Sequence, residues 1–209
     1  MKKLEFNNNG LKEDTVSSFC NYLKRNTTLE DLSIAKNSIC SFTFGTISSA
    51  LLKITCLTTL NLTGNPLFSP FGQFINEYLI SVTGLKNLFL SECSLDKYCI
   101  EGISSALKYN KMLTYLNDDG NKLLDSDVTP LFKILRKSSL LHLHLKNNCI
   151  TKISTFALDV SASNLQTLDV ENNKISINNS MQFFQFVSGH NTTLRTILLK
   201  DPTISTWCS

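Results

Sequence analysis

Apolar residues recur along the chain in a fixed phrase of eleven positions. In "LTTLNLTGNPL", which begins at Leu57, apolar residues stand at positions 1, 4, 6 and 11, and an Asn stands at position 9. The alternation of Leu60 and Leu62 with polar neighbours predicts a short strand with one apolar side. Thr59 and Asn61 would then lie together on the opposite, polar side of that strand.

The same phrase recurs eight times at nearly constant spacing. Its copies begin near residues 1, 29, 57, 85, 113, 140, 165 and 194, and successive starts are 25 to 29 residues apart. A single copy could not bury its own apolar side, whereas stacked copies bury it together. The spacing therefore predicts one repeat domain over residues 1–209.

Helical periodicity fills the second half of most copies. The stretch "TVSSFCNYL" carries apolar residues at helical spacing, namely Val16, Phe19, Cys20 and Leu23. Near copies of one helical phrase, "ISSALL" and "ISSALK", begin at Ile47 and Ile103. A further helix is predicted in "DSDVTPLFKIL", with Asp125 as its N-cap and Pro130 within its first turn.

An Asn occupies the ninth position in six of the eight copies. There the chain turns out of the strand, and an amide side chain can satisfy backbone groups of neighbouring coils. These residues are Asn9, Asn37, Asn65, Asn121, Asn148 and Asn173. Cys93 is a weak substitute in the fourth copy, and Pro202 in the eighth copy suggests that the pattern is ending there.

The phrase Leu-x-x-Leu-x-Leu-x-x-Asn-x-Leu resembles the leucine-rich repeat family. The period near 28, with helical second halves, resembles the ribonuclease-inhibitor-type repeats of that family. The resemblance covers nearly the whole chain. It implies an α/β solenoid, or horseshoe, of about eight repeats, with a parallel inner sheet on the concave face and helices on the outer face.

Asp118 departs from the pattern at the sixth position, where the other copies carry an apolar residue. A buried ionised carboxylate is costly unless it is paired. One interpretation is a perturbed acid that serves a site. The other, which we favour from the sequence, is a local distortion in "NDDGN" that lets water or backbone N–H groups solvate the carboxylate.

Positions 3, 5 and 7 of each copy should face the concave surface. From the fourth copy onward these positions bring aromatic rings together, with acidic residues around them. Aromatic side chains exposed on a rigid sheet are typical anchors of protein interfaces. We therefore expect partner contacts at a surface that we name the inner-face patch, which consists of Phe89, Tyr115, Asn117, Asp119, His142, His144, Asp169 and Glu171. The competing interpretation is that these are ordinary exposed side chains of a solenoid.

The histidines of the inner-face patch also raise the possibility of a metal site. His142 and His144 stand two apart on one predicted strand, with Asp169 beside His144 and Asp119 within diagonal reach. Two imidazoles and a carboxylate are a plausible zinc set. Side chains two apart diverge on a concave surface, however, and the sequence offers no second shell. We expect no metal and no cofactor.

Composition and motifs favour a binding protein over an enzyme. The net charge of +3 is small, and the Lys and Arg residues are scattered along the chain. We therefore expect neither a nucleic acid nor a membrane as the partner. No phosphate-binding loop, serine-hydrolase elbow or zinc-protease motif is present, and we expect no catalytic residue. Seven cysteines without a C-x-x-C pair favour reduced thiols in the cytoplasm.

Three individual cysteines and one histidine have simple structural interpretations. Cys40, Cys93 and Cys149 lie at or near pattern positions and should be small buried hydrophobic residues. His190 should lie in a solvated return loop.

We therefore expect a non-enzymatic module that binds a protein partner through its concave face. Two alternatives stay open within what the resemblance implies. One is a regulator of a catalytic partner, such as a small-GTPase activator, although no acidic tail and no matching catalytic arginine can be placed here. The other is an actin-capping repeat domain of the tropomodulin type. Flanking segments, a partner, self-association or a fold-back of Trp207 would cover the two ends.

Overall fold

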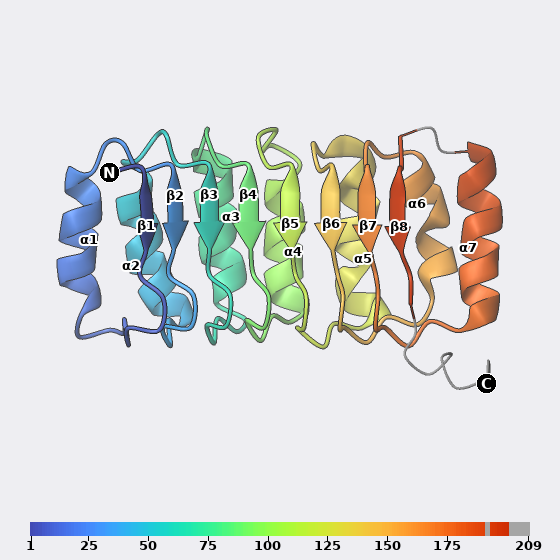
Figure 1. The fold of residues 1–209 in the computed structure, drawn as a ribbon, viewed down its shortest axis with the longest axis horizontal. Helices are drawn as coiled ribbons and strands as arrows, with labels where there is room; N and C mark the ends of the chain where they lie inside the picture. The colour runs from blue at the N-terminus through green and yellow to red at the C-terminus, as the bar shows by residue number, and fades with distance from the viewer. Residues whose placement is uncertain (191–192, 201–209) are drawn as a thin grey trace.

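The strands form one open parallel sheet in the computed structural model, which describes residues 1–190 and 193–200 (Figure 1). Within these residues eight strands stand side by side in chain order. They are β1 (Lys3–Glu5), β2 (Asp31–Ser33), β3 (Thr59–Asn61), β4 (Asn87–Phe89), β5 (Tyr115–Asn117), β6 (His142–His144), β7 (Thr167–Asp169) and β8 (Thr196–Leu198).

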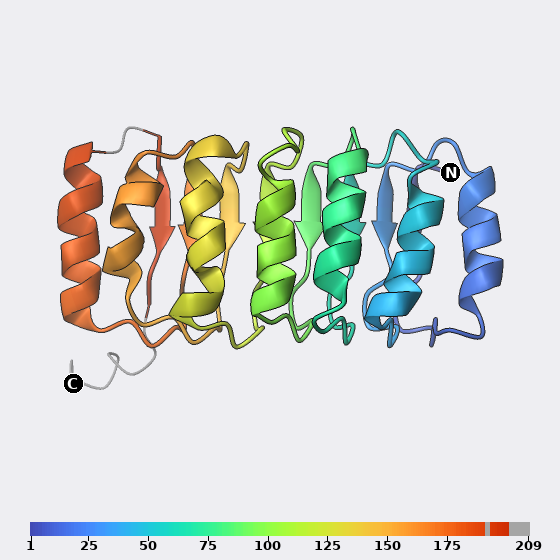
Figure 2. The ribbon, with the colours of Figure 1, turned by 180° about the vertical axis from the view of Figure 1, so that it is seen from behind.

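Helices cover one face of this sheet and leave the other face open (Figure 2). They are α1 (Val16–Arg25), α2 (Ser41–Leu51), α3 (Phe71–Ser81), α4 (Lys97–Ala106), α5 (Asp125–Ile134), α6 (Ala157–Ser161) and α7 (Ile177–His190), with short 3₁₀ turns η1 (Leu135–Lys137) and η2 (Ile153–Phe156). In Figure 1, α1 and α7 lie beyond the two ends of the sheet, so the row of helices is longer than the row of strands. The sheet therefore forms the inner face, as predicted. No helix of the described residues is long and apolar enough to span a bilayer.

Corresponding phrase positions pair with one another across the sheet. Leu60 stands opposite Leu32 on one side and Leu88 on the other, and the same register continues along the strands. Leu60 and Leu62 are fully buried against the helices, while Thr59 on the other side of the strand is half-buried. The predicted strand with one apolar side is confirmed.

The ninth-position asparagines connect each coil to its neighbours. Asn65 Oδ1 accepts hydrogen bonds from the N–H groups of Asn37 at 2.9 Å and Ile39 at 3.0 Å. Its Nδ2 donates to the carbonyl oxygens of Ile34 at 3.0 Å and Leu62 at 2.6 Å. One buried side chain thus satisfies four backbone groups in two coils, which confirms the predicted role.

Cys93 replaces the asparagine in the fourth coil with fewer contacts. Its Sγ lies 3.2 Å from the carbonyl oxygen of Leu62 and 3.4 Å from that of Ser91, so it is a weak donor to both. Sulfur offers no equivalent of the amide oxygen. Pro202 and Trp207 lie outside the described residues.

The turns after β1 to β7 use a left-handed backbone at the eighth phrase position. The φ angles lie between 53° and 71° at Asn8, Lys36, Gly64, Glu92, Gly120, Asn147 and Asn172. Gly and Asn adopt this conformation at least cost, and they fill five of these seven positions. The phrase Leu-x-x-Leu-x-Leu-x-x-Asn-x-Leu leaves this position unspecified, so the conformation was not predicted.

The start of α5 differs from the prediction. Its N-cap is Leu124, whose N–H donates to Asp127 Oδ2 at 2.9 Å, and Asp125 is already the first helical residue. The carboxylate of Asp125 instead accepts the N–H of Thr151 at 2.9 Å and so holds the next coil. Pro130 lies in the middle of the helix, beyond the first turn. The predicted places of Asp125 and Pro130 were wrong because the carboxylate at the third helical position reaches back to the cap.

Three further single-residue predictions need correction or refinement. His190 is the last residue of α7 rather than part of a loop, and its ring stacks on Phe186 at 4.6 Å. It is exposed, as expected. Cys93 is fully buried as predicted, but Cys40 and Cys149 are only partly buried.

Candidate partner-binding surface

All eight residues of the inner-face patch lie on neighbouring strands β4 to β7 or in the turns that follow them. Their strands are joined in one register, with Tyr115 opposite His142 and His144 opposite Asp169. Helices cover the far face of the sheet (Figures 1 and 2). The strand residues of the patch alternate with leucines buried against those helices, so their side chains point to the uncovered face. The structure therefore brings the predicted residues together on one surface.

Four rings form a compact aromatic group with Tyr115 at its centre. The centroid of Tyr115 lies 5.0 Å from that of Phe89 and 4.9 Å from that of His144, with tilts of 39° and 32°. His142 lies 6.0 Å away. These spacings fall in the range of favourable offset ring pairs. Burial among its neighbours raises the pKa of Tyr115, and the nearby charges of Asp119 and Asp169 raise it further.

Asp169 lies at the end of this ring row and is more buried than predicted. Its residue is only 6% exposed, although the fifth phrase position was expected to face solvent. Its Oδ1 accepts the N–H of Glu171 at 3.0 Å. Its Oδ2 lies 3.5 Å from His144 Nδ1, at the outer limit of a hydrogen bond. Asp169 is therefore a fixed carboxylate with one incompletely satisfied oxygen.

Asp119, in the turn after β5, is held by its neighbours. Its Oδ1 accepts the N–H of Lys146 at 2.6 Å, and its Oδ2 accepts Asn117 Nδ2 at 2.9 Å. Burial raises the pKa of Asp119, and the charge of Asp169 adds to this, while the two hydrogen bonds oppose the shift.

Lys146 belongs to this surface, although the predicted inner-face patch omitted it. Its Nζ pairs with Glu171 at 2.9 Å, and its backbone N–H holds Asp119. The sequence signal was available, because Lys146 occupies the seventh phrase position, just after the strand of His142 and His144.

The histidine nitrogens turn to separate partners rather than to a shared point. His142 Nδ1 lies 3.1 Å from Thr167 Oγ1, while His144 Nδ1 faces Asp169. Among residues 1–190 and 193–200, no three His, Cys, Asp or Glu side chains are placed to hold a metal ion. The zinc alternative gains no support from this geometry.

A hollow of about 300 Å³ lies beside the rings, over the first strands of the inner face. Phe89 forms one wall, and Ser33 and Asn61 contribute to a floor of small polar side chains. At the far end Lys3 and Glu5 form an exposed ion pair of 2.8 Å. The inner face therefore has a raised aromatic part next to a low polar part.

Asp118 lies behind the inner-face patch, in the interior. Its backbone keeps the sheet register, since its N–H donates to the carbonyl oxygen of His144 at 2.9 Å. The residue is fully buried, and neither carboxylate oxygen has a hydrogen-bond partner within the described part of the chain. The expected local distortion was therefore wrong. Burial, with a smaller contribution from Asp119, raises the pKa of Asp118 to about 8.

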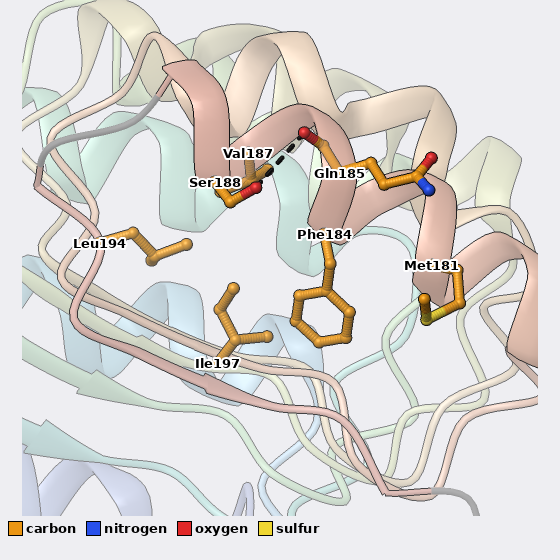
Figure 3. A pocket seen from close by; sticks show the side chains of 7 residues that line it. All are labelled: Met181, Phe184, Gln185, Val187, Ser188, Leu194 and Ile197. Atoms are coloured by element: carbon orange, nitrogen blue, oxygen red, sulfur yellow. Dashed lines mark hydrogen bonds between the residues drawn. The ribbon is translucent and has the colours of Figure 1, made fainter.

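A second, apolar hollow of about 350 Å³ lies between α7 and β8 (Figure 3). Phe184 and Val187 of α7 face Leu194 and Ile197 across it. Ile197 is half-buried, whereas Leu168, the corresponding residue of the preceding strand, is fully buried. The hollow exists because no further coil of the described residues covers this end.

Comparison with known proteins agrees with this repeating architecture. The family model described as Leucine Rich Repeat matches residues 164–185, which span β7 and part of α7. The coils of this chain are leucine-rich repeats. The family assignment predicted from the phrase is confirmed.

Curated relatives contain the same kind of leucine-rich region within much longer chains. The chain is 32% identical over 172 residues to "NACHT, LRR and PYD domains-containing protein 14" of Mus musculus, covering 79% of this chain and 17% of the relative. It is 27% identical over 200 residues to "Protein CARMIL" of Dictyostelium discoideum, covering 91% of this chain and 19% of the relative. The chain thus spans less than a fifth of the length of these relatives.

A solved structure shows the same leucine-rich fold. Internalin C2 of Listeria monocytogenes superimposes with a TM-score of 0.53 at 20% sequence identity, covering 95% of this chain and 80% of that one. At this identity the likeness concerns the fold alone, and it confirms the predicted α/β solenoid with a parallel inner sheet.

Proposed function

We propose that this leucine-rich chain is a non-enzymatic interaction module that binds a protein partner through the inner-face patch. The observation that carries the proposal is the ring row of Phe89, Tyr115 and His144, fixed at spacings near 5 Å on the uncovered face of the sheet. Leucine-rich repeats commonly mediate protein–protein contacts, and the proposal extends that role to this surface.

The preformed geometry of the surface supports this role. Each ring is held by another ring, and Asp119 and Asp169 are held by backbone N–H groups. Binding a partner costs little side-chain entropy on this surface, because the side chains of the inner-face patch are already ordered. We further propose that residues 1–209 act as one repeat domain in the cytoplasm and that the chain itself performs no chemistry.

The double variant Phe89→Ala/Tyr115→Ala tests the proposal. Because both rings are partly exposed, their truncation should leave the fold intact but reduce partner capture roughly tenfold or more. The measurement is affinity capture from the native lysate, quantified by mass spectrometry, with circular dichroism to verify folding. The matched control is Phe42→Ala/Tyr98→Ala, which removes two exposed rings at 69% and 62% exposure from the helical layer.

The control variant should capture the same partner as the unmodified chain. Undiminished capture by a folded Phe89→Ala/Tyr115→Ala chain would show that the partner binds elsewhere.

A further inference from the structure

We propose that the inner-face patch receives an arginine side chain from an extended basic segment of the partner, placed against the Tyr115 and His144 rings and paired with Asp119 and Asp169. This inference rests on the proposed function and specifies the chemistry of the partner. It is carried by the charge, the burial and the ring geometry of the surface.

The local charge is opposite to that of the whole chain. Asp119, Asp169 and Glu171 lie close together, and Lys146 is the one lysine among them, already paired with Glu171 at 2.9 Å. Within the described residues, Asp169 has an ion pair only with His144, at 3.5 Å, and Asp119 has none. The surface is thus locally negative in a chain whose net charge is +3.

The two aspartates are positioned but not neutralised by a strong cation. Each accepts a backbone N–H, which fixes its orientation without supplying a full charge. Asp169 is only 6% exposed, so its charge is poorly screened by water. Burial raises the pKa of Asp119, its hydrogen bonds and His144 oppose the rise, and the charge of Asp169 adds a repulsion between the two carboxylates. A bound cation would relieve this repulsion.

The rings favour arginine among the possible cations. A guanidinium group is planar, stacks on aromatic faces and binds carboxylates through paired N–H donors. The ring row of Phe89, Tyr115 and His144 runs to the carboxylate of Asp169, with Asp119 in the adjoining turn. Stacking and carboxylate contacts are therefore available to one side chain. A lysine ammonium can also lie over a ring, but it cannot stack as a plane or bind a carboxylate through paired N–H donors.

The hollow beside Phe89 gives room for the residues next to that arginine. Its floor carries Ser33, Thr59 and Asn61, which are small and can form hydrogen bonds to an extended backbone. A segment that crosses the strands from this hollow would pass over the Phe89 ring before it reaches the carboxylates. An acidic segment would meet the same carboxylates with repulsion.

The direct test uses NMR titration of the full isotope-labelled chain with the peptide acetyl-Gly-Arg-Gly-Arg-Gly-amide. Its twin contains citrulline in place of arginine, which keeps the shape and removes the charge. We expect the arginine peptide to shift the signals of Tyr115, His144 and Asp169 and to bind at least about fivefold more tightly than its twin. Its affinity should also fall as salt is raised.

The variants Asp119→Asn and Asp169→Asn remove the charges and keep an oxygen that can accept the backbone N–H. Each should weaken binding of the arginine peptide severalfold, while Asp14→Asn, an exposed carboxylate elsewhere on the chain, should leave binding unchanged. Three results would each overturn the inference. The citrulline twin could bind as tightly as the arginine peptide, the arginine peptide could fail to bind at millimolar concentration, or both inner-face variants could bind it fully.

Capture of the partner from the lysate by two double variants distinguishes a failure of this inference from a failure of the proposed function. Loss of capture by Phe89→Ala/Tyr115→Ala together with retained, salt-insensitive capture by Asp119→Asn/Asp169→Asn would overturn the arginine inference and leave the proposed function standing. Capture that survives both double variants would overturn the proposed function.

Discussion

At the scale of single residues, Asp118 is the position where the repeat pattern and the structure conflict. Other coils place an apolar residue here, and Leu62 and Leu90 at the corresponding positions are fully buried. Asp118 keeps the backbone hydrogen bond of that position, so the coil accepts the carboxyl group without changing its path. The group is therefore accommodated in its neutral form, because burial raises its pKa to about 8.

This burial predicts a pH-dependent stability. The folded chain holds Asp118 protonated up to about pH 8, whereas the unfolded chain ionises it near its ordinary value of about 3.9. The unfolded state therefore gains stability as pH rises, and the free energy of unfolding should fall between about pH 4 and pH 8, by up to about 1.4 kcal/mol per unit. Urea unfolding across this range measures the slope.

Two variants isolate the contribution of this carboxyl group. Asp118→Leu should remove the slope and stabilise the chain at pH 8 by a few kcal/mol, because it restores the apolar residue of the other coils. Asp14→Asn, which removes an exposed carboxylate, should keep the slope of the unmodified chain. Identical slopes for Asp118→Leu and the unmodified chain would contradict the assignment.

At the scale of elements, α3 and α4 pack backbone against backbone at two glycines. A Cβ atom added to Gly102 would lie 2.0 Å from the carbonyl oxygen of Gly72, and one added to Gly72 would lie 2.3 Å from that of Tyr98. Backbone meets backbone here, so no side chain could move aside. Asn76 closes the contact by donating to the Gly102 carbonyl at 2.9 Å.

The variant Gly102→Ala should therefore destabilise the chain even though alanine favours helices. We expect a loss of about 3 kcal/mol or more, because the added methyl group must push two backbones apart. Gly189→Ala in α7 is the matched control, since nothing lies within 4 Å of its added Cβ. The control should gain about 0.5–1 kcal/mol. Thermal and urea unfolding measure both changes, and equal effects would refute the close contact.

The sequence predicted these elements well because each one repeats a periodic phrase. Leu60 and Leu62 marked the strand, and Asn65 marked the turn, from patterns that recur in most of the copies. Contacts between coils were harder to predict, because they depend on how far apart neighbouring elements lie. The Gly72–Gly102 contact is of this kind.

The candidate site likewise combines features that the repeat predicts with features that depend on contacts between strands. The strand positions of Tyr115 and His144 followed from the repeat, and the structure places their rings together as expected. The depth of Asp169 and the role of Lys146 did not follow, because both depend on side-chain contacts across strands. The backbone path at Asp118 was predicted wrongly, because the sequence alone could not show that a neutral carboxyl group fits the interior.

At the scale of the whole molecule, stability should depend on the place of a coil along the stack. Each coil contacts only its neighbours, so central coils are covered on two sides and the outermost described coils on one. Leu88 on β4 is fully buried, whereas Leu4, at the same phrase position on β1, is only half-buried.

Truncation of these two equivalent leucines should therefore have unequal effects. Leu88→Ala should reduce the free energy of unfolding by about 3 kcal/mol or more, and Leu4→Ala by about 1 kcal/mol. Urea unfolding followed by circular dichroism gives both values. Equal losses would show that the first coil is as well covered as the centre.

The unbroken register from β1 to β8 also limits the shape of a partner. It turns the inner face into a grid whose columns are about 4.8 Å apart. A straight α-helix laid across the columns offers a side chain about every 5.4 Å, so the two spacings fall half a step out of phase after roughly four columns. Four strands, β4 to β7, carry the inner-face patch. A straight helical ligand would thus drift by about 1.8 Å over the three steps between these strands, which limits how much of the inner-face patch one helix can match side chain for side chain.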